Sequence, residues 1–281
     1  MTQSILITGA STGIGEACAL HFIQQGWTVF AGVRKQIDAE RLRNEAGDGL
    51  MPLLLDVTVP DQIEQAQRAV ADHVGERGLD GLVNNAGIAV SGPMELIPMN
   101  EFRRQFEVNV LGQVAVTQAF IPMLRQAQGR IINISSLSGQ MVFPFFGAYA
   151  GSKFALEAFS DALRRELAPW NIRVAVIEPG AVKTPIWDKS IKANTDKLEA
   201  LNDDRLELYR KSLDAILDTA ARNGANGMDV EVVVDSIHHA MTHDHPKTRY
   251  LLLPGGTPFF YRTLIRALPD RWLDRIIKRR T

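Results

Sequence analysis

Short apolar runs alternate along most of this chain with longer segments of helical periodicity. The runs are rich in Ile, Leu and Val and cover residues 5–7, 29–31, 53–55, 82–83, 131–134, 174–177 and 250–253. Runs that are apolar at nearly every position are typical of strands buried on both faces. Their alternation with helices predicts a doubly wound parallel sheet in a three-layer α/β/α single domain spanning residues 1–281. We expect ligands at the carboxyl ends of its strands.

The pattern changes after Thr184. Residues 185–228 are rich in Asp, Lys, Asn and Arg, with helical periodicity at 206–217, and we interpret them as a flap over the site. After a further helix at about 230–241 and the last strand, residues 254–281 form an aromatic and basic tail. This tail can cap the site or make weak contact with lipid headgroups.

Composition narrows the class of protein. A net charge of -1 over 281 residues argues against a nucleic-acid-binding body. The single Cys18 excludes an intramolecular disulfide and a cysteine-rich metal site, and its apolar helical surroundings indicate packing. Met1 stands so close to the first strand that we expect no secretion signal, and the apolar runs are shorter than the roughly 18 residues of a membrane-spanning helix. We therefore expect a cytoplasmic protein.

Tyr149 and Lys153 are the candidate acid/base pair. Four residues apart, they lie on one face of a helix, where a fixed ammonium favours phenolate over phenol. To titrate near neutrality, the tyrosine pKa must fall by about three units from ~10, equivalent to about 4 kcal/mol. One exposed ion pair does not supply that energy, so we expect a second cation, the oxidised nicotinamide, to contribute. The alternative is an ordinary pair on a helix surface.

A glycine-rich turn follows the first strand. Gly9, Gly13 and Gly15 allow the backbone to approach a pyrophosphate, and a helix beginning near Gly13 offers free N–H groups and a positive dipole end. A turn in this position, between a strand and a helix, is typical of dinucleotide binding.

Several short motifs occur together in a definite order. The glycine turn has three residues between its first two glycines and is followed by Asn-Asn-Ala-Gly at 84–87, Asn109, Ser136, Tyr149, Lys153 and Pro179-Gly180. In this combination the chain resembles the short-chain dehydrogenase/reductase family over roughly residues 4–253. The resemblance implies a Rossmann-type fold and hydride transfer between a nicotinamide cofactor and a carbonyl or secondary alcohol.

The resemblance also implies a role for each matching residue. Ser136 would hydrogen-bond the substrate oxygen, Tyr149 would exchange its proton, and Lys153 would hold the nicotinamide ribose while lowering the tyrosine pKa. Asn109 would support a water relay behind Lys153. The expected cofactor contacts are Gly9, Ser11, Thr12, Gly13, Ile14, Gly15, Arg34, Asp56, Val57, Asn85, Ala86, Gly87, Tyr149, Lys153, Pro179, Gly180, Val182 and Thr184. For the segments at 84–87 and 179–184, a purely structural turn is the alternative.

The end of the second strand bears on the coenzyme. Gly32 stands where an acidic residue would accept hydrogen bonds from the ribose of NAD, and Arg34 and Lys35 follow it. This charge favours NADP(H) over NAD(H). Two observations weaken the preference: many NADP-preferring relatives have a basic residue where this chain has Thr12, and Arg34 can simply be solvated.

The loop between the serine and the tyrosine, residues 141–146, is unusually apolar. It suits a steroid-, retinoid- or lipid-like substrate, although packing in a lid or a subunit contact is the alternative. The intact Ser136, Tyr149 and Lys153 argue against a catalytically silent dinucleotide-sensing or scaffolding protein. Helices at 100–124 and 149–167 resemble those that pair subunits in this family, so we expect a homodimer or homotetramer. We expect no metal site, because His238, His239, His243 and His245 lie far from the motifs along the chain.

Overall fold

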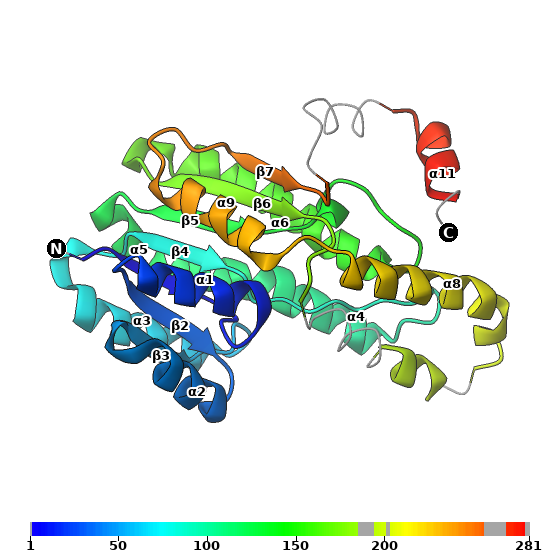
Figure 1. The fold of residues 1–281 in the computed structure, drawn as a ribbon, viewed down its shortest axis with the longest axis horizontal. Coiled ribbons are helices and arrows are strands. Elements are labelled where there is room, and N and C mark those ends of the chain that lie inside the picture. The colour runs from blue at the N-terminus through cyan, green and yellow to red at the C-terminus, as the bar shows by residue number, and fades with distance from the viewer. Residues whose placement is uncertain (1, 185–193, 201–202, 256–267, 279–281) are drawn as a thin grey trace.

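A parallel sheet with the strand order β3-β2-β1-β4-β5-β6-β7 forms the centre of the computed structural model, which describes residues 2–184, 194–200, 203–255 and 268–278 (Figure 1). Its strands are β1 (Ser4–Ile7), β2 (Thr28–Val33), β3 (Leu50–Leu54), β4 (Gly81–Asn84), β5 (Arg130–Ile134), β6 (Arg173–Pro179) and β7 (Arg249–Leu252). Every neighbouring pair runs parallel, which confirms the predicted doubly wound sheet.

The strand order reverses at β1, which pairs with β2 on one side and with β4 on the other. The connections after β1 and β4 therefore diverge and leave a crevice at the carboxyl edge of the sheet. The sequence motifs lie along this edge.

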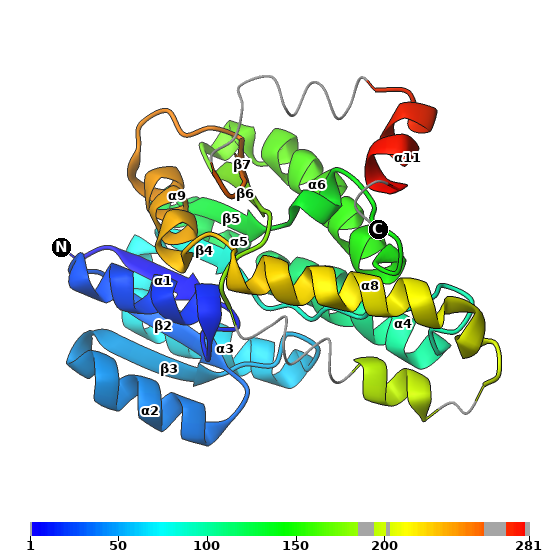
Figure 2. The same cartoon turned by 45° about the vertical axis from the view of Figure 1, so that its right-hand side comes forward.

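Helices cover both faces of the sheet (Figures 1 and 2). They are α1 (Gly13–Gln24), α2 (Gln36–Ala46), α3 (Pro60–Val74), α4 (Met99–Phe106), α5 (Gly112–Ala127), α6 (Gly147–Glu166), α8 (Leu206–Ala225), α9 (Val230–Thr242) and α11 (Asp270–Lys278). Side chains alternate across each strand, so Ile5 and Ile7 pack with α1, α2 and α9, whereas Leu6 packs on the opposite face with α3 and α5.

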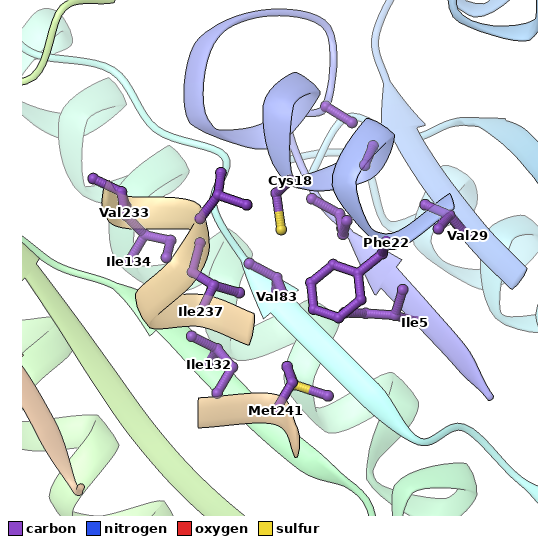
Figure 3. Close-up of a cluster of buried hydrophobic side chains, with 14 of the residues drawn as sticks. Ile5, Cys18, Phe22, Val29, Val83, Ile132, Ile134, Val233, Ile237 and Met241 are labelled. Atoms are coloured by element: carbon purple, nitrogen blue, oxygen red, sulfur yellow. The ribbon is translucent and has the colours of Figure 1, made fainter. Parts of the chain in front are cut away.

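Cys18 lies in the first of these two cores. It is fully buried on α1, in the same cluster as Phe22 of α1 and Ile237 and Met241 of α9 (Figure 3). Burial without a neighbouring cation raises the pKa of the thiol far above its ordinary range. The expected packing role fits this environment.

Most elements begin or end within one or two residues of the predicted limits, and β3 and α8 differ more. β3 begins at Leu50 rather than at residue 53, and it includes Pro52. A proline is tolerated there because β3 is an edge strand of the sheet. Helix α8 extends to Ala225, well past the predicted limit at residue 217.

Helix α8 lies beside α4, beyond the carboxyl ends of the strands (Figures 1 and 2). Leu206 and Leu213 of α8 cluster with Leu96 and Leu198, and Phe145 and Tyr209 pack against this group. Part of the predicted flap, residues 185–193 and 201–202, lies outside the described residues.

The C-terminal tail is described only in part, because residues 256–267 and 279–281 lie outside the described ranges. Among the helices that are described, none has both the length and the apolar character needed to cross a bilayer.

Candidate active site

The glycine turn after β1 has a geometry that side chains would obstruct. Gly9 and Gly13 have φ values of 65° and 63°, in the left-handed region that favours glycine. A Cβ on Gly9 would lie 2.8 Å from the Cα of Ala86, and one on Gly15 would lie 2.4 Å from the carbonyl oxygen of Gly9. Thr12 precedes α1 and provides no side-chain cap, so the first N–H groups of the helix have no side-chain partner there. This cradle fits the pyrophosphate of a dinucleotide.

Asn85 and Thr8 hold this turn in shape. The side-chain amide of Asn85 donates to the carbonyl oxygens of Thr8 and Gly9, at 2.9 and 3.0 Å. In return, the Thr8 hydroxyl accepts the backbone N–H groups of Asn85 and Ala86, both at 3.0 Å. Asn85 thus has a structural role, and a direct cofactor contact through residues 85–87 remains a prediction.

Asn109 lies in a π-helical turn, Glu107–Leu111, between α4 and α5. Its side chain is buried, accepts the N–H of Ile88 at 2.9 Å and donates to the Ile88 carbonyl at 3.0 Å and to the Ser152 hydroxyl at 3.2 Å. π-Turns inside helices are frequent at functional sites. These bonds fix the Asn109 amide in place, and its support of a relay behind Lys153 stays a prediction.

Tyr149 and Lys153 lie together near the amino end of α6, and both are buried. The Lys153 Nζ donates to the carbonyl oxygen of Ile134 at 2.8 Å. The same atom lies 5.7 Å from the centroid of the Tyr149 ring. The helix therefore brings the predicted pair to the carboxyl end of β5.

Burial dominates the pKa values of this pair. It lowers the pKa of Lys153 to about 8, although Glu157 acts in the opposite direction. It also raises the pKa of Tyr149, although a hydrogen bond with Ser136 acts against the increase. In the protein alone the pKa of Tyr149 is thus raised, because desolvation penalises the phenolate, and the expected lowering by Lys153 together with a bound cofactor stays a prediction. A phenolate would require further positive charge beside the ring.

Ser136 follows β5 and caps a short 3-10 turn, Leu137–Gly139. Its hydroxyl accepts the N–H of Ser138 at 3.1 Å and donates to the Pro179 carbonyl at 3.4 Å, which joins the connections after β5 and β6. Ser136 is thus within hydrogen-bonding reach of Tyr149 and at the same edge of the sheet.

The remaining predicted residues lie around this edge. Arg34 is exposed directly after β2, and Val57 is buried after β3. Asp56 accepts the backbone N–H and the hydroxyl of Thr58 at 3.0 and 2.7 Å. Val182 bridges to Met228, and a Cβ on Gly13 would lie 3.4 Å from Thr184, so the turns after β1 and β6 meet.

Two groups near the site were missed by sequence reasoning. Arg41 of α2 donates to the Ser11 carbonyl at 2.8 Å and pairs with Glu16. Arg249 of β7 pairs with Glu157 of α6, Nε to Oε2 at 2.9 Å. The spacing of Glu157, four residues after Lys153, was a usable signal, but nothing local points to Arg41 or Arg249.

The four histidines lie elsewhere. His238 shares a hydrogen bond of 2.7 Å with His21, and His239 shares one of the same length with Tyr250. No group of three metal-ligating side chains occurs among the described residues. Two surface cavities of about 440 and 420 Å³ lie at the amino-terminal edge of the sheet, away from Tyr149; His245 lines the first, and His21, His238, His239 and His243 line the second.

The family model for short chain dehydrogenases matches residues 3–195. This chain belongs to the short-chain dehydrogenase family. The resemblance found from the motifs is thereby confirmed. Membership in the family makes the protein an NAD(P)-dependent oxidoreductase, as predicted, and gives no support to the alternative of a catalytically silent dinucleotide-binding protein.

Curated family members are similar over most of their length. Retinol dehydrogenase 5 of Mus musculus is 37% identical, with 97% of this chain and 87% of that protein covered. The NADPH-dependent 3-dehydrocapnine reductase of Ornithobacterium rhinotracheale is 36% identical, with 96% and 94% covered.

Solved structures agree with the fold. A short-chain dehydrogenase from Streptomyces avermitilis has a TM-score of 0.77 and 26% identity, with 99% of this chain and 95% of that chain covered. A closed form of serine dehydrogenase complexed with NADP+ also has a TM-score of 0.77, with 27% identity and 92% and 97% covered.

Proposed function

We propose that this short-chain dehydrogenase transfers a hydride between NADP(H) and a carbonyl or secondary alcohol of an apolar, lipid-like substrate. The observation that carries the proposal is the meeting of Ser136, Tyr149 and Lys153 at the carboxyl end of β5, beside a glycine cradle shaped for a pyrophosphate. The proton donor, the hydroxyl that would bind the substrate oxygen and the cofactor cradle therefore lie at one edge of the sheet.

Each side chain has a separate task. The nicotinamide, when bound, supplies or accepts the hydride. In reduction, the Ser136 hydroxyl holds the carbonyl oxygen while the Tyr149 hydroxyl gives it a proton; in oxidation, the phenolate of Tyr149 takes that proton back. Lys153 holds the ribose through its N–H donors, and its charge favours the phenolate.

An apolar substrate fits the surroundings of Tyr149. The connection that contains Phe145 packs with Leu96, Leu213 and Tyr209 of the neighbouring cluster, so the space beyond the strand ends has an apolar wall. Met141 is buried in the same connection. Relatives include retinol dehydrogenase 5 and estradiol 17-beta-dehydrogenase 2, both of Mus musculus, and the alcohols in these names are lipid-like.

The flap forms part of this proposal. Tyr209 of α8 donates to Glu95 at 2.5 Å and its ring meets Phe145 edge to face, 6.1 Å between centroids. Arg205 also pairs with Glu95 at 3.3 Å. We infer that α8 docks on the substrate loop and excludes water from the hydride-transfer site.

The preference for NADP(H) rests on charge. Arg34 is exposed at the end of β2 and forms no ion pair with any described residue, so it is available to a 2′-phosphate. Relatives supply examples of NADP binding, including the serine dehydrogenase complex, although a 3-ketoacyl-(acyl-carrier-protein) reductase from Brucella melitensis was solved with NADH. Arg34→Ala should weaken NADPH binding by about tenfold or more and leave NADH binding unchanged. Equal weakening of both would remove the basis for the phosphate assignment.

Subunit pairing through α4, α5 and α6 also belongs to the proposal. Leu111 of the π-turn before α5 and Phe154 and Phe159 of α6 expose 52%, 43% and 42% of their surface, which is unusual for large apolar side chains unless another surface covers them. A homodimer or homotetramer would cover them. Light scattering that finds only monomer would contradict this.

The tail allows a weak membrane contact of an otherwise cytoplasmic protein. Trp272 of α11 is 58% exposed, and the guanidinium of Arg275 lies 5.7 Å from its ring centroid. Aromatic and basic side chains of this kind suit the headgroup region of a bilayer. Vesicle binding that is lost on truncation after Pro254 would support the contact.

The central test follows NADPH and NADH consumption across a panel of apolar ketones and aldehydes. Tyr149→Phe keeps the ring and removes the proton, so it should lower kcat/KM roughly 10³-fold while leaving the NADPH dissociation constant nearly unchanged. Wild-type turnover in this variant would show that another group donates the proton.

A further inference from the structure

A buried cluster of charges lies behind Lys153, where α6 packs against β6 and β7. Its centre is Arg249, whose side chain is 9% exposed. Arg249 meets the carboxylates of Glu157 at 2.9 Å, Asp161 at 2.8 Å and Glu178 at 3.4 Å. Three carboxylates therefore face one buried guanidinium, and one of them, Asp161, also pairs with Arg164 and Arg165.

Glu157 connects this cluster to Lys153. The two residues are one helical turn apart on the same face of α6, and both are buried. One carboxylate oxygen of Glu157 binds Arg249, whereas the other, Oε1, is buried without a hydrogen-bond partner. Such an oxygen is costly to bury unless a nearby positive charge offsets the cost. Lys153 is a buried cation on the same face, and the charge of Glu157 favours its ammonium form.

The other charged and polar groups around Glu157 do not cancel its effect on Lys153. Arg249 of β7 and Glu178 of β6 face it with opposite signs. Gln140, which donates to Glu178 at 2.8 Å, is neutral. Asp161 lies a further turn along α6, is partly exposed and also pairs with Arg164. Exposure and pairing reduce the field that Asp161 exerts at Lys153.

We propose that Glu157, anchored by Arg249, is a positioning residue that keeps Lys153 in its ammonium form and aimed at the cofactor ribose. This inference rests on the proposed function, because Lys153 is assigned there to the ribose. Without Glu157, burial would deprive Lys153 of its proton closer to neutral pH, and a neutral amine is a weaker ribose ligand. Glu157 thus extends the pH range in which the dinucleotide binds.

The test measures the NADPH dissociation constant of the full chain by cofactor fluorescence between pH 6 and pH 10, a measurement that needs no turnover. In the wild type, affinity should fall as pH rises past about 8, where Lys153 loses its proton. In Glu157→Gln this alkaline limb should move down by roughly one pH unit. Asp161→Asn is the matched control: it removes another acidic partner of Arg249 and should leave the limb in place.

Glu157→Gln keeps the shape of the side chain and leaves Arg249 two acidic partners, so it is expected to fold, and its Tm checks this. A folded variant with an unmoved limb would overturn the proposal, as would an equal shift in Asp161→Asn. If Glu157→Gln does not fold, Glu157→Asp replaces it: this variant keeps the charge and should match the wild-type limb within about 0.3 pH unit. A fall of a full unit in Glu157→Asp would overturn the proposal. A wild type that binds neither NADPH nor NADH would refute the proposed function instead.

Discussion

We predict that the buried charge of Lys153 lowers the free energy of unfolding, and that Lys153→Met raises it. The ammonium is buried, and its pKa in the folded protein is about 8. In the unfolded chain the ordinary value is near ~10.4, so holding the proton costs the folded state about 3 kcal/mol at pH 7. Methionine fills similar space without a charge but leaves the Ile134 carbonyl without its donor, a loss of about 1 kcal/mol. The expected net gain in unfolding free energy is about 2 kcal/mol.

The sign of the pH dependence provides a second check. Between pH 8 and the unfolded value, the unfolded state binds a proton that the folded state has released, so the wild type becomes more stable as pH rises. Lys153→Met should therefore be more stable than the wild type at pH 7 and slightly less stable at pH 10.5, where only the lost hydrogen bond to Ile134 still counts. Urea unfolding followed by circular dichroism at the two pH values measures both differences. A variant that is less stable at pH 7, or equally stabilised at both values, would refute the reasoning.

Two further predictions concern the cofactor cradle and the flap. Gly15→Ala places a Cβ 2.4 Å from the Gly9 carbonyl oxygen and should weaken NADPH binding by about tenfold or more, measured by fluorescence titration. Gly224→Ala is the control, because the space around Gly224 is open. Equal NADPH affinity in both variants would contradict the proposed cradle. Tyr209→Phe removes the hydrogen bond to Glu95. In steady-state kinetics it should raise KM for apolar substrates several-fold, and it should leave the NADPH dissociation constant unchanged. An unchanged KM would argue against docking of α8 at the site.

The order of strands and helices could be predicted from the sequence because the strands are short continuous apolar runs, whereas the helices repeat apolar residues every three or four positions. Ile5, Leu6 and Ile7 read simply as a buried strand, and only the structure divides them between the two cores. β3 was placed too late because the prediction followed the apolar run at 53–55, whereas the strand begins before it and includes Pro52, which an edge strand accepts.

Within the site, residues that belong to local motifs could be predicted from the sequence, whereas contacts between distant segments could not. The spacing of Tyr149 and Lys153 predicted their common face. The π-turn around Asn109 left no mark in the pattern, because one widened turn hardly changes helical periodicity. Arg249 reaches Glu157 across 92 positions of chain, so only the pairing of β6 with β7 brings them together.

Desolvation was the main physical effect that spacing alone could not weigh. By its spacing from Tyr149, Lys153 is simply a cation that lowers the tyrosine pKa. In the fold both side chains are buried, and the loss of water raises the pKa of Tyr149 and lowers that of Lys153. The extent of burial depends on how α6 packs against the connections after β5 and β6, which no local pattern encodes.

The sole thiol of this chain offers a built-in reporter of unfolding. Cys18 is enclosed where α1 meets α9, and its thiolate form is strongly disfavoured, so a disulfide reagent should react with it only after these helices separate. Labelling kinetics in the presence and absence of NADPH would then measure how far the dinucleotide slows that opening, without any engineered probe.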